Sequence, residues 1–137
     1  PSSCKKPYER FLDCLTSLVP HKLDELTQLT LHFDFDQHKV RPANVAKLKS
    51  LAAYIKYSEH IDVVFINGHT DAKGSKSYNT KLAQRRIASV QKLLSAHGAP
   101  KEKFKQTAYG ERRPIATNRK AWGRAKNRRV YVKVMTN

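Results

Sequence analysis

Residues 61–97 contain a short apolar run, then a polar loop and then a long stretch with helical periodicity. Ile61 to Ile66 is nearly continuous in apolar residues, the pattern of a central strand buried on both faces. Residues 68–77 form a glycine-containing loop, and from Tyr78 to His97 apolar residues recur at helical spacing until Gly98 stops the helix. This order constrains the chain to a layered fold in which the helix packs on a sheet. The predicted core positions of the helix are Leu82, Ile87, Val90, Leu93 and Leu94.

The segments on either side supply the other expected elements. Residues 29–35 alternate with period two, which predicts a strand with Leu29, Leu31, Phe33 and Phe35 on one face. Pro42 suits the first turn of a helix, predicted over 42–57. The buried stripe of that helix is expected to be Val45, Leu48, Leu51, Ala52 and Ile55.

The C-terminal third predicts two further strands. The first runs from Phe104 to Tyr109, and a polar loop with one helical turn follows over 111–127. In the last strand Val130, Val132 and Val134 alternate with more polar neighbours. The element order is then β-α-β-α-β-β. The expected fold class is α/β (α+β), with a mixed four-stranded sheet and two main helices packed on one face.

Charge is the strongest compositional signal, with 27 Lys and Arg against 11 Asp and Glu and a formal net charge of +16. Such a surface attracts polyanions, among which nucleic acid is the usual partner. The basic residues are spread along the whole chain, and no zinc-finger, helix-turn-helix or RNP signature is present. An acidic cell-wall polymer or anionic lipid headgroups would satisfy the charge equally well, as would a solvated surface.

Residues 1–28 are predicted to be an N-terminal arm or linker that belongs to a neighbouring domain, before the domain at 29–137. Both cysteines, Cys4 and Cys14, fall in this arm. On one continuous helix they would be about 15 Å apart along the axis, too far for a disulfide. A break at Pro7 would let them close a small loop, so paired and unpaired thiols both stay open.

Motifs for catalysis or cofactor binding are missing from the sequence. The segment from Gly68 to Gly74 has five residues between its glycines, and Ser75 stands where a phosphate-binding loop requires lysine. No two histidines have metal-ligand spacing, although His32 and Asp34 would share a strand face. We therefore expect no enzyme activity, no cofactor and no metal.

Asp71 and Arg86 form the most specific candidate pair. An acid that follows a strand and an arginine two turns into the next helix can meet at one point. Together they would recognise a group that carries both an ammonium and a carboxylate, because arginine binds a carboxylate through two parallel hydrogen bonds. Gly68 and Gly74 would turn backbone N–H groups towards an anionic ligand. The alternative is a plain salt bridge that ties the loop to the helix.

Four blocks of sequence, in register over about residues 29–135, resemble the OmpA-like peptidoglycan-binding domain. They are Phe33-Asp-Phe35-Asp36; Gly68-His-Thr-Asp71-x-x-Gly74-Ser75-x-x-Tyr78-Asn79-x-x-Leu82-x-x-Arg85-Arg86; Tyr109-Gly110-Glu111-x-x-Pro114; and Gly123-Arg124-Ala125-x-Asn127-Arg128-Arg129-Val130. Two features depart from the family pattern. The loop from Pro114 to Asn127 is short and basic, and residues 1–28 match nothing in the common domain.

The resemblance implies non-covalent binding of peptidoglycan through the free end of meso-diaminopimelate in the stem peptide. Asp71 takes the ammonium and Arg86 the carboxylate. It also implies a periplasmic location at the outer membrane or cell wall, with envelope proteins of one assembly as partners, membrane contact only indirect and no nucleic acid. The other residues expected to line the pocket are Phe35, Asp36, Gly68, Thr70, Gly74, Asn79, Leu82 and Arg128.

Overall fold

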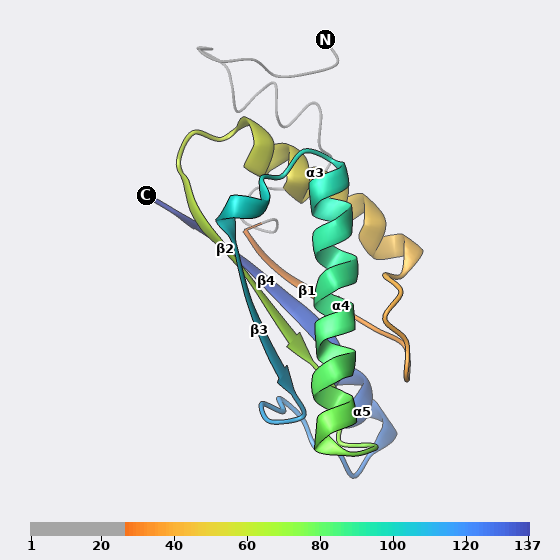
Figure 1. Ribbon diagram of the computed structural model, residues 1–137. Helices are drawn as coiled ribbons and strands as arrows, with labels where there is room; N and C mark the ends of the chain where they lie inside the picture. Colours follow the sequence, from red (N-terminus) through yellow and green to blue (C-terminus); the bar gives the residue numbers. More distant parts are fainter. Residues whose placement is uncertain (1–26) are drawn as a thin grey trace.

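A computed structural model describes residues 27–137, which form one four-stranded sheet with the order β1-β4-β2-β3. Strand β2 pairs in parallel with β3 and antiparallel with β4, and β1 pairs antiparallel with β4. Helices α3 and α4 lie on one face of the sheet (Figure 1), so the predicted fold class is confirmed. The elements are β1 (Gln28–His32), α3 (Pro42–Tyr57), β2 (Ile61–His69), α4 (Lys76–Ala96), the 3₁₀ turn η1 (Lys101–Lys103), β3 (Phe104–Gly110), α5 (Ala121–Asn127) and β4 (Arg129–Thr136).

The core lies between the sheet and the two long helices. Val130, Val132 and Val134 all face it and are buried, which confirms the predicted phase of the last strand. The expected helix stripes also lie there: Leu48, Leu51, Ala52 and Ile55 from α3, with Ile87, Val90 and Leu94 from α4, are buried, and Val45 and Leu93 are partly buried.

Helix α4 begins at Lys76, two residues before the predicted start. The side chain of Ser75 accepts a hydrogen bond from the backbone N–H of Tyr78 at 3.1 Å, so Ser75 is the N-cap. At the other end Gly98 has a φ of +101°, a left-handed conformation that ends the helix as predicted.

Strand β2 departs from the prediction in two ways. It continues through Gly68 and His69, which pair with Val130 and Arg129 of β4, so the expected loop starts two residues later. Its second face is also only partly covered. Val63, Phe65 and Asn67 are half-buried on the side of the sheet away from the helices, because both long helices pack on the other side.

Phe35 does not share the buried face of Leu29, Leu31 and Phe33. Strand β1 ends at His32, and a turn follows in which the N–H of Gln37 donates to the carbonyl of Asp34 at 3.1 Å. Alternation stops where the strand stops, and Phe35 is 56% exposed. The predictions for Cys4, Cys14 and all but the last two residues of the arm lie outside the described residues, and Gln28 is already the first residue of β1. Between residues 27 and 137, no helix is long and apolar enough to cross a membrane.

Candidate ligand-binding site

A cavity of about 200 Å³ lies where the end of β2 meets the start of α4. The loop after β1 and the residue that precedes β4 complete its wall. Four segments distant in sequence therefore converge here. The lining residues are Phe35, Asp36, Thr70, Asp71, Lys73, Gly74, Tyr78, Asn79, Leu82, Arg86 and Arg128.

Arg86 lines this cavity with a fully buried side chain. Its Nε donates to the carbonyl of Gln37 at 2.8 Å, Nη1 to that of His69 at 3.0 Å, and Nη2 to that of Asp34 at 3.2 Å. The guanidinium also lies 5.2 Å from the centroid of the Phe33 ring, a cation–π contact. The backbone of the loop after β1 and of the end of β2 thus holds the group in place.

The charge of Arg86 is not matched by a direct ion pair within the described chain. None of the carboxylates of residues 27–137 lies within salt-bridge distance of it. Burial lowers the pKa of the Arg86 guanidinium to about 10, although the nearby Asp71 acts in the opposite direction. The group is still protonated at neutral pH, so the cavity contains a buried cation.

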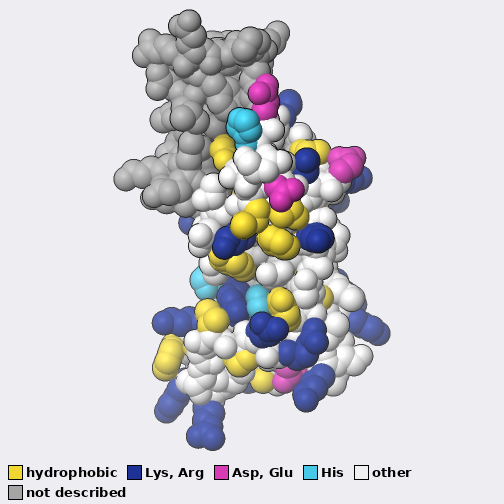
Figure 2. Space-filling model, turned by 90° about the vertical axis from the view of Figure 1, so that its left-hand side faces the viewer, with side chains coloured by type: hydrophobic (Ala, Val, Ile, Leu, Met, Phe, Trp, Pro, Cys, Tyr) yellow, Lys and Arg dark blue, Asp and Glu magenta, His cyan; other side chains and the backbone are white. Residues whose placement is uncertain are grey.

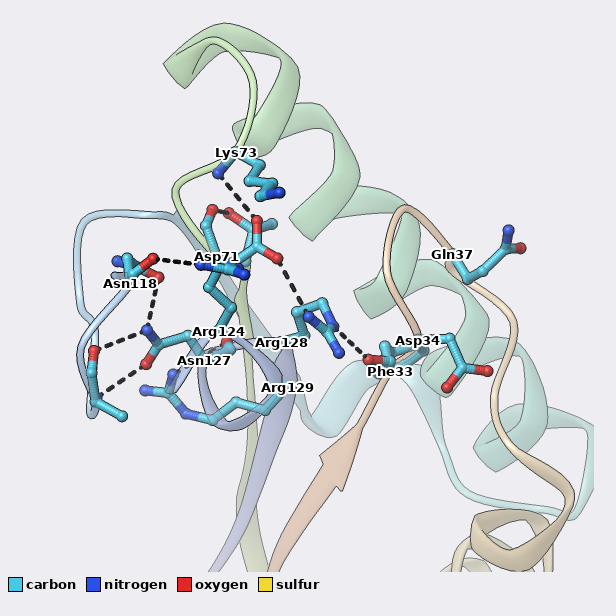
Figure 3. Close-up of polar contacts among 12 residues, drawn as sticks. Phe33, Asp34, Gln37, Asp71, Lys73, Asn118, Arg124, Asn127, Arg128 and Arg129 are labelled. Carbon is cyan, nitrogen blue, oxygen red and sulfur yellow. Dashed lines mark hydrogen bonds and ion pairs between the residues drawn. The ribbon is translucent and has the colours of Figure 1, made fainter. Parts of the chain in front are cut away.

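Asp71 is also buried, and its carboxylate is held from two sides. Oδ1 accepts a hydrogen bond from the backbone N–H of Lys73 at 3.0 Å, and Oδ2 lies 3.4 Å from Nη1 of Arg128. Figure 3 shows the carboxylate between these two residues. The simple Asp71–Arg86 salt bridge is therefore not formed: the acid pairs with Arg128, and Arg86 binds backbone carbonyls.

Backbone and side-chain contacts hold the remaining wall. The N–H of Thr70 donates to the carbonyl of Gly110 at 2.8 Å, and Asn79 donates to the side chain of Glu111 at 3.2 Å. Across the cavity, the hydroxyl of Tyr78 donates to the carboxylate of Asp36, which links the start of α4 to the loop after β1. This bond raises the pKa of the Tyr78 hydroxyl above its ordinary value.

The segment that leads into β4 is organised by Asn127. Its Oδ1 accepts hydrogen bonds from the N–H groups of Ile115 and Ala116, and its Nδ2 donates to Ala116 and Asn118. In α5 a Cβ on Gly123 would lie 1.9 Å from the Thr117 carbonyl oxygen, so only glycine fits. These contacts position Arg124, Arg128 and Arg129. Figure 3 shows the hydrogen bond between Asn118 and Asn127.

The structure brings both members of the predicted pair to one cavity, together with seven of the eight predicted lining residues. Gly68 is the exception. It packs against α4, where a Cβ would lie 2.7 Å from the Ala83 carbonyl oxygen, so the glycine permits close packing of strand and helix. Lys73 and Tyr78 also line the cavity but were not predicted to do so. Both lie inside the sequence block from Gly68 to Arg86, and that position was the signal that could have identified them. Within residues 27–137, His, Cys, Asp and Glu side chains form no group of three that could hold a metal.

Basic side chains gather at the end of the molecule where the cavity lies. Figure 2 shows Lys and Arg concentrated around the lower end, towards which β3 and the loop after it run in Figure 1. Residues 111–129 contain one acid, Glu111, and eight basic residues: Arg112, Arg113, Arg119, Lys120, Arg124, Lys126, Arg128 and Arg129.

Comparison with known proteins agrees with this fold and with the sequence blocks. The chain is 30% identical over 125 residues to the sodium-type flagellar protein MotY of Vibrio parahaemolyticus, covering 91% of this chain and 43% of MotY. It is 40% identical over 108 residues to outer membrane porin F of Pseudomonas aeruginosa, covering 78% of this chain and 31% of the porin. This chain thus spans less than half the length of either relative.

Among solved structures, the peptidoglycan-associated lipoprotein from Burkholderia pseudomallei superposes with a TM-score of 0.71 at 30% identity. The alignment covers 77% of this chain and 89% of that one. The C-terminal domain of Helicobacter pylori MotB has the same fold, with a TM-score of 0.70 at 23% identity, covering 80% and 85% of the two chains. The model of the OmpA family matches residues 32–128, and the chain belongs to that family.

Proposed function

We propose that this domain binds bacterial peptidoglycan non-covalently and holds the free end of meso-diaminopimelate between Asp71 and Arg86. That end carries an ammonium and a carboxylate on one carbon. Asp71 accepts hydrogen bonds from the ammonium, and Arg86 donates to the carboxylate. The observation that carries the proposal is the buried, protonated Arg86, which lines a cavity without a carboxylate from residues 27–137 at salt-bridge distance.

Hydrogen-bond counting supports this role for Arg86. A guanidinium has five N–H donors, and three of them point at backbone carbonyls. One donor is left on each terminal nitrogen, and a carboxylate has acceptors for both. The cost of burying the cation is already part of the folded state. An anion that enters the cavity gains the full interaction, since Arg86 needs no further desolvation.

The names of the relatives support the wider setting. Peptidoglycan-associated lipoprotein, outer membrane porin and MotY are all names of cell-envelope proteins. We propose a location in the periplasm at the outer membrane or cell wall, with residues 29–137 as the module that anchors an envelope assembly, such as a flagellar stator, to the wall. The role is binding without catalysis, and any contact with a membrane is indirect.

Nucleic acid is the alternative partner. The basic end of the molecule supports it, because Trp122 is 59% exposed beside the Lys126 ammonium, and exposed aromatic rings with cations bind single strands. Retention on DNA with no retention on insoluble peptidoglycan would support this alternative over the cell wall.

The proposal is tested by calorimetric titration of the wild-type protein with two stem peptides. They differ only in having diaminopimelate or lysine as the third residue. Lysine offers the ammonium without the carboxylate, so the two remaining N–H donors of the buried Arg86 would be left without an acceptor in the complex. That loss costs about 1–3 kcal/mol, which is a roughly tenfold to hundredfold weaker affinity. Equal affinity for the two peptides would contradict the assignment.

Substitutions assign the two charges separately. Asp71→Asn keeps the shape and removes the charge, so it should weaken binding of both peptides. Arg86→Lys keeps the charge and removes the planar pair of donors, so it should weaken the diaminopimelate peptide more. Alanine is avoided at Arg86 because it would leave three carbonyls unpaired. The control is Asp62→Asn, an exposed position on β2, and thermal unfolding checks each variant.

A further inference from the structure

A second cavity of about 220 Å³ adjoins the first and differs from it in charge. The two share Phe35, Lys73 and Arg128, and the second is completed by Ala121 and Arg124 of α5. The first cavity contains two carboxylates, Asp36 and Asp71. The second has three cations in its lining and no acid. It therefore suits an anionic group next to the one held in the first cavity.

The cations of this second cavity are only partly engaged. Arg128 is the one that lies near a carboxylate, that of Asp71 at 3.4 Å, and its Nε donates to the carbonyl of Phe33. Arg124 uses Nη1 to donate to the carbonyl of Asn118 at 3.0 Å. Lys73 lies with its ammonium 5.9 Å from the centroid of the exposed Phe35 ring. Among residues 27–137, no carboxylate lies at salt-bridge distance from Lys73 or Arg124.

Contacts within the domain keep Arg124 near Lys73. Its helix can approach the 115–118 loop because Gly123 has no side chain, and Asn127 ties that loop to α5. On the other side, the backbone N–H of Lys73 is bonded to Asp71, so the lysine stays beside the first cavity. Lys73 and Arg124 therefore come from separate segments and line the same cavity. This arrangement distinguishes them from basic residues scattered over a surface.

We propose that this second cavity binds another carboxylate of the same ligand, the free α-carboxylate of the glutamate that precedes diaminopimelate in the stem peptide. That glutamate is joined to diaminopimelate through its side-chain carboxyl group, which leaves the α-carboxylate ionised and close to the neighbouring residue. The inference rests on the proposed function. With diaminopimelate in the first cavity, Lys73 and Arg124 bind a glutamate that carries a free α-carboxylate more tightly than one that carries a neutral amide.

The test compares two diaminopimelate tetrapeptides that differ only at this group, one with a free glutamate α-carboxylate and one with the α-carboxamide. Both have an amidated C-terminus. Wild-type protein should bind the carboxylate form about tenfold to 150-fold more tightly, the range for a charge-assisted hydrogen bond. Lys73→Gln and Arg124→Gln should each lower affinity for the carboxylate form more than for the amide form, so that the wild-type preference shrinks.

Lys126→Gln is the matched control. Lys126 is exposed on α5, carries the same charge and does not line the cavity. It should keep the wild-type preference. An equal loss in this variant would show that general positive charge causes the effect, and would overturn the site. Arg124→Gln also removes the hydrogen bond to Asn118, which can perturb the 115–118 loop. Lys73→Gln then still tests the second cavity, because Lys73 is exposed.

Further outcomes separate this inference from the proposed function. Equal binding of the two tetrapeptides by wild type, with the preference for diaminopimelate over lysine intact, would overturn the second site alone. No binding of either tetrapeptide would overturn both. A third peptide, with the glutamate amide and a free C-terminus, identifies the source of the anion. If it regained the full affinity, the C-terminal carboxylate would be the occupant, and the assignment to glutamate would be wrong.

Discussion

His69 lies directly behind the cavity and is the buried histidine of the described chain. Its carbonyl accepts from Arg86, its ring stacks on Tyr109 with centroids 5.2 Å apart, and its Nδ1 has no hydrogen-bond partner among residues 27–137. Burial, reinforced by Arg129 and Arg113, lowers the pKa of the His69 imidazole to about 4. His69 is therefore neutral at physiological pH.

This shift predicts how stability depends on pH. The unfolded state, with an ordinary pKa near 6.5, binds a proton between about pH 6.5 and pH 4 that the folded state does not. The free energy of unfolding should fall as pH drops through this window, by up to about 1.4 kcal/mol per pH unit from this one residue. Chemical denaturation of wild type, His69→Gln and the exposed-site control His97→Gln measures the slope. His69→Gln should flatten it, and an unchanged slope would show that His69 does not cause it.

Helix α4 presents four of the eleven residues that line the cavity, because Tyr78, Asn79, Leu82 and Arg86 all lie on its first turns. Its start depends on the Ser75 cap, which satisfies the N–H of Tyr78. The cap thus has two consequences: it stabilises the helix, and it sets where the Tyr78 side chain meets Asp36.

Removing the cap should destabilise the domain moderately. Ser75→Ala should lower the free energy of unfolding by about 1 kcal/mol, within a range of roughly 0.5–2 kcal/mol. Ser75→Asp should keep wild-type stability, since aspartate caps equally well and its charge suits a helix N-terminus. Ser77→Ala, an exposed change two residues on, is the control. Urea denaturation gives all four values, and equal stability of Ser75→Ala and Ser77→Ala would refute the capping role.

At the scale of the whole molecule, the formal charge of +16 is distributed unevenly, with the cavity end the most basic. Salt separates the two candidate partners. Binding to a polyanion that makes six to ten phosphate contacts falls by about 10³–10⁵ between 50 and 200 mM salt. A stem peptide bound in a partly buried cavity is screened much less, so its affinity should change by less than about tenfold. Titrations of the peptide and of single-stranded DNA over this range make the comparison. A steep salt dependence for the peptide would place its binding on the exposed basic surface.

Local pattern predicted most of the fold. The alternation of Val130, Val132 and Val134, the helical stripes and the stop at Gly98 each depend on neighbours within one turn or one strand, so sequence spacing is sufficient. The same spacing placed Asp71 and Arg86 near each other, because a strand end and the first turns of the next helix are close in any such unit. Sequence therefore determined the element order, most of the buried faces and most of the residues that line the cavity.

Only the tertiary structure decided which groups touch. Asp71 pairs with Arg128, 57 residues away, and Arg86 binds carbonyls 49 and 52 residues away, since the pairing of β4 with β2 on one side and with β1 on the other brings those segments together. The same pairing extends β2 through Gly68, and the end of β1 turns Phe35 outwards. Periodicity describes residues that share one element. The contacts of a site depend on strand order and on where each strand ends, and long-range pairing determines both.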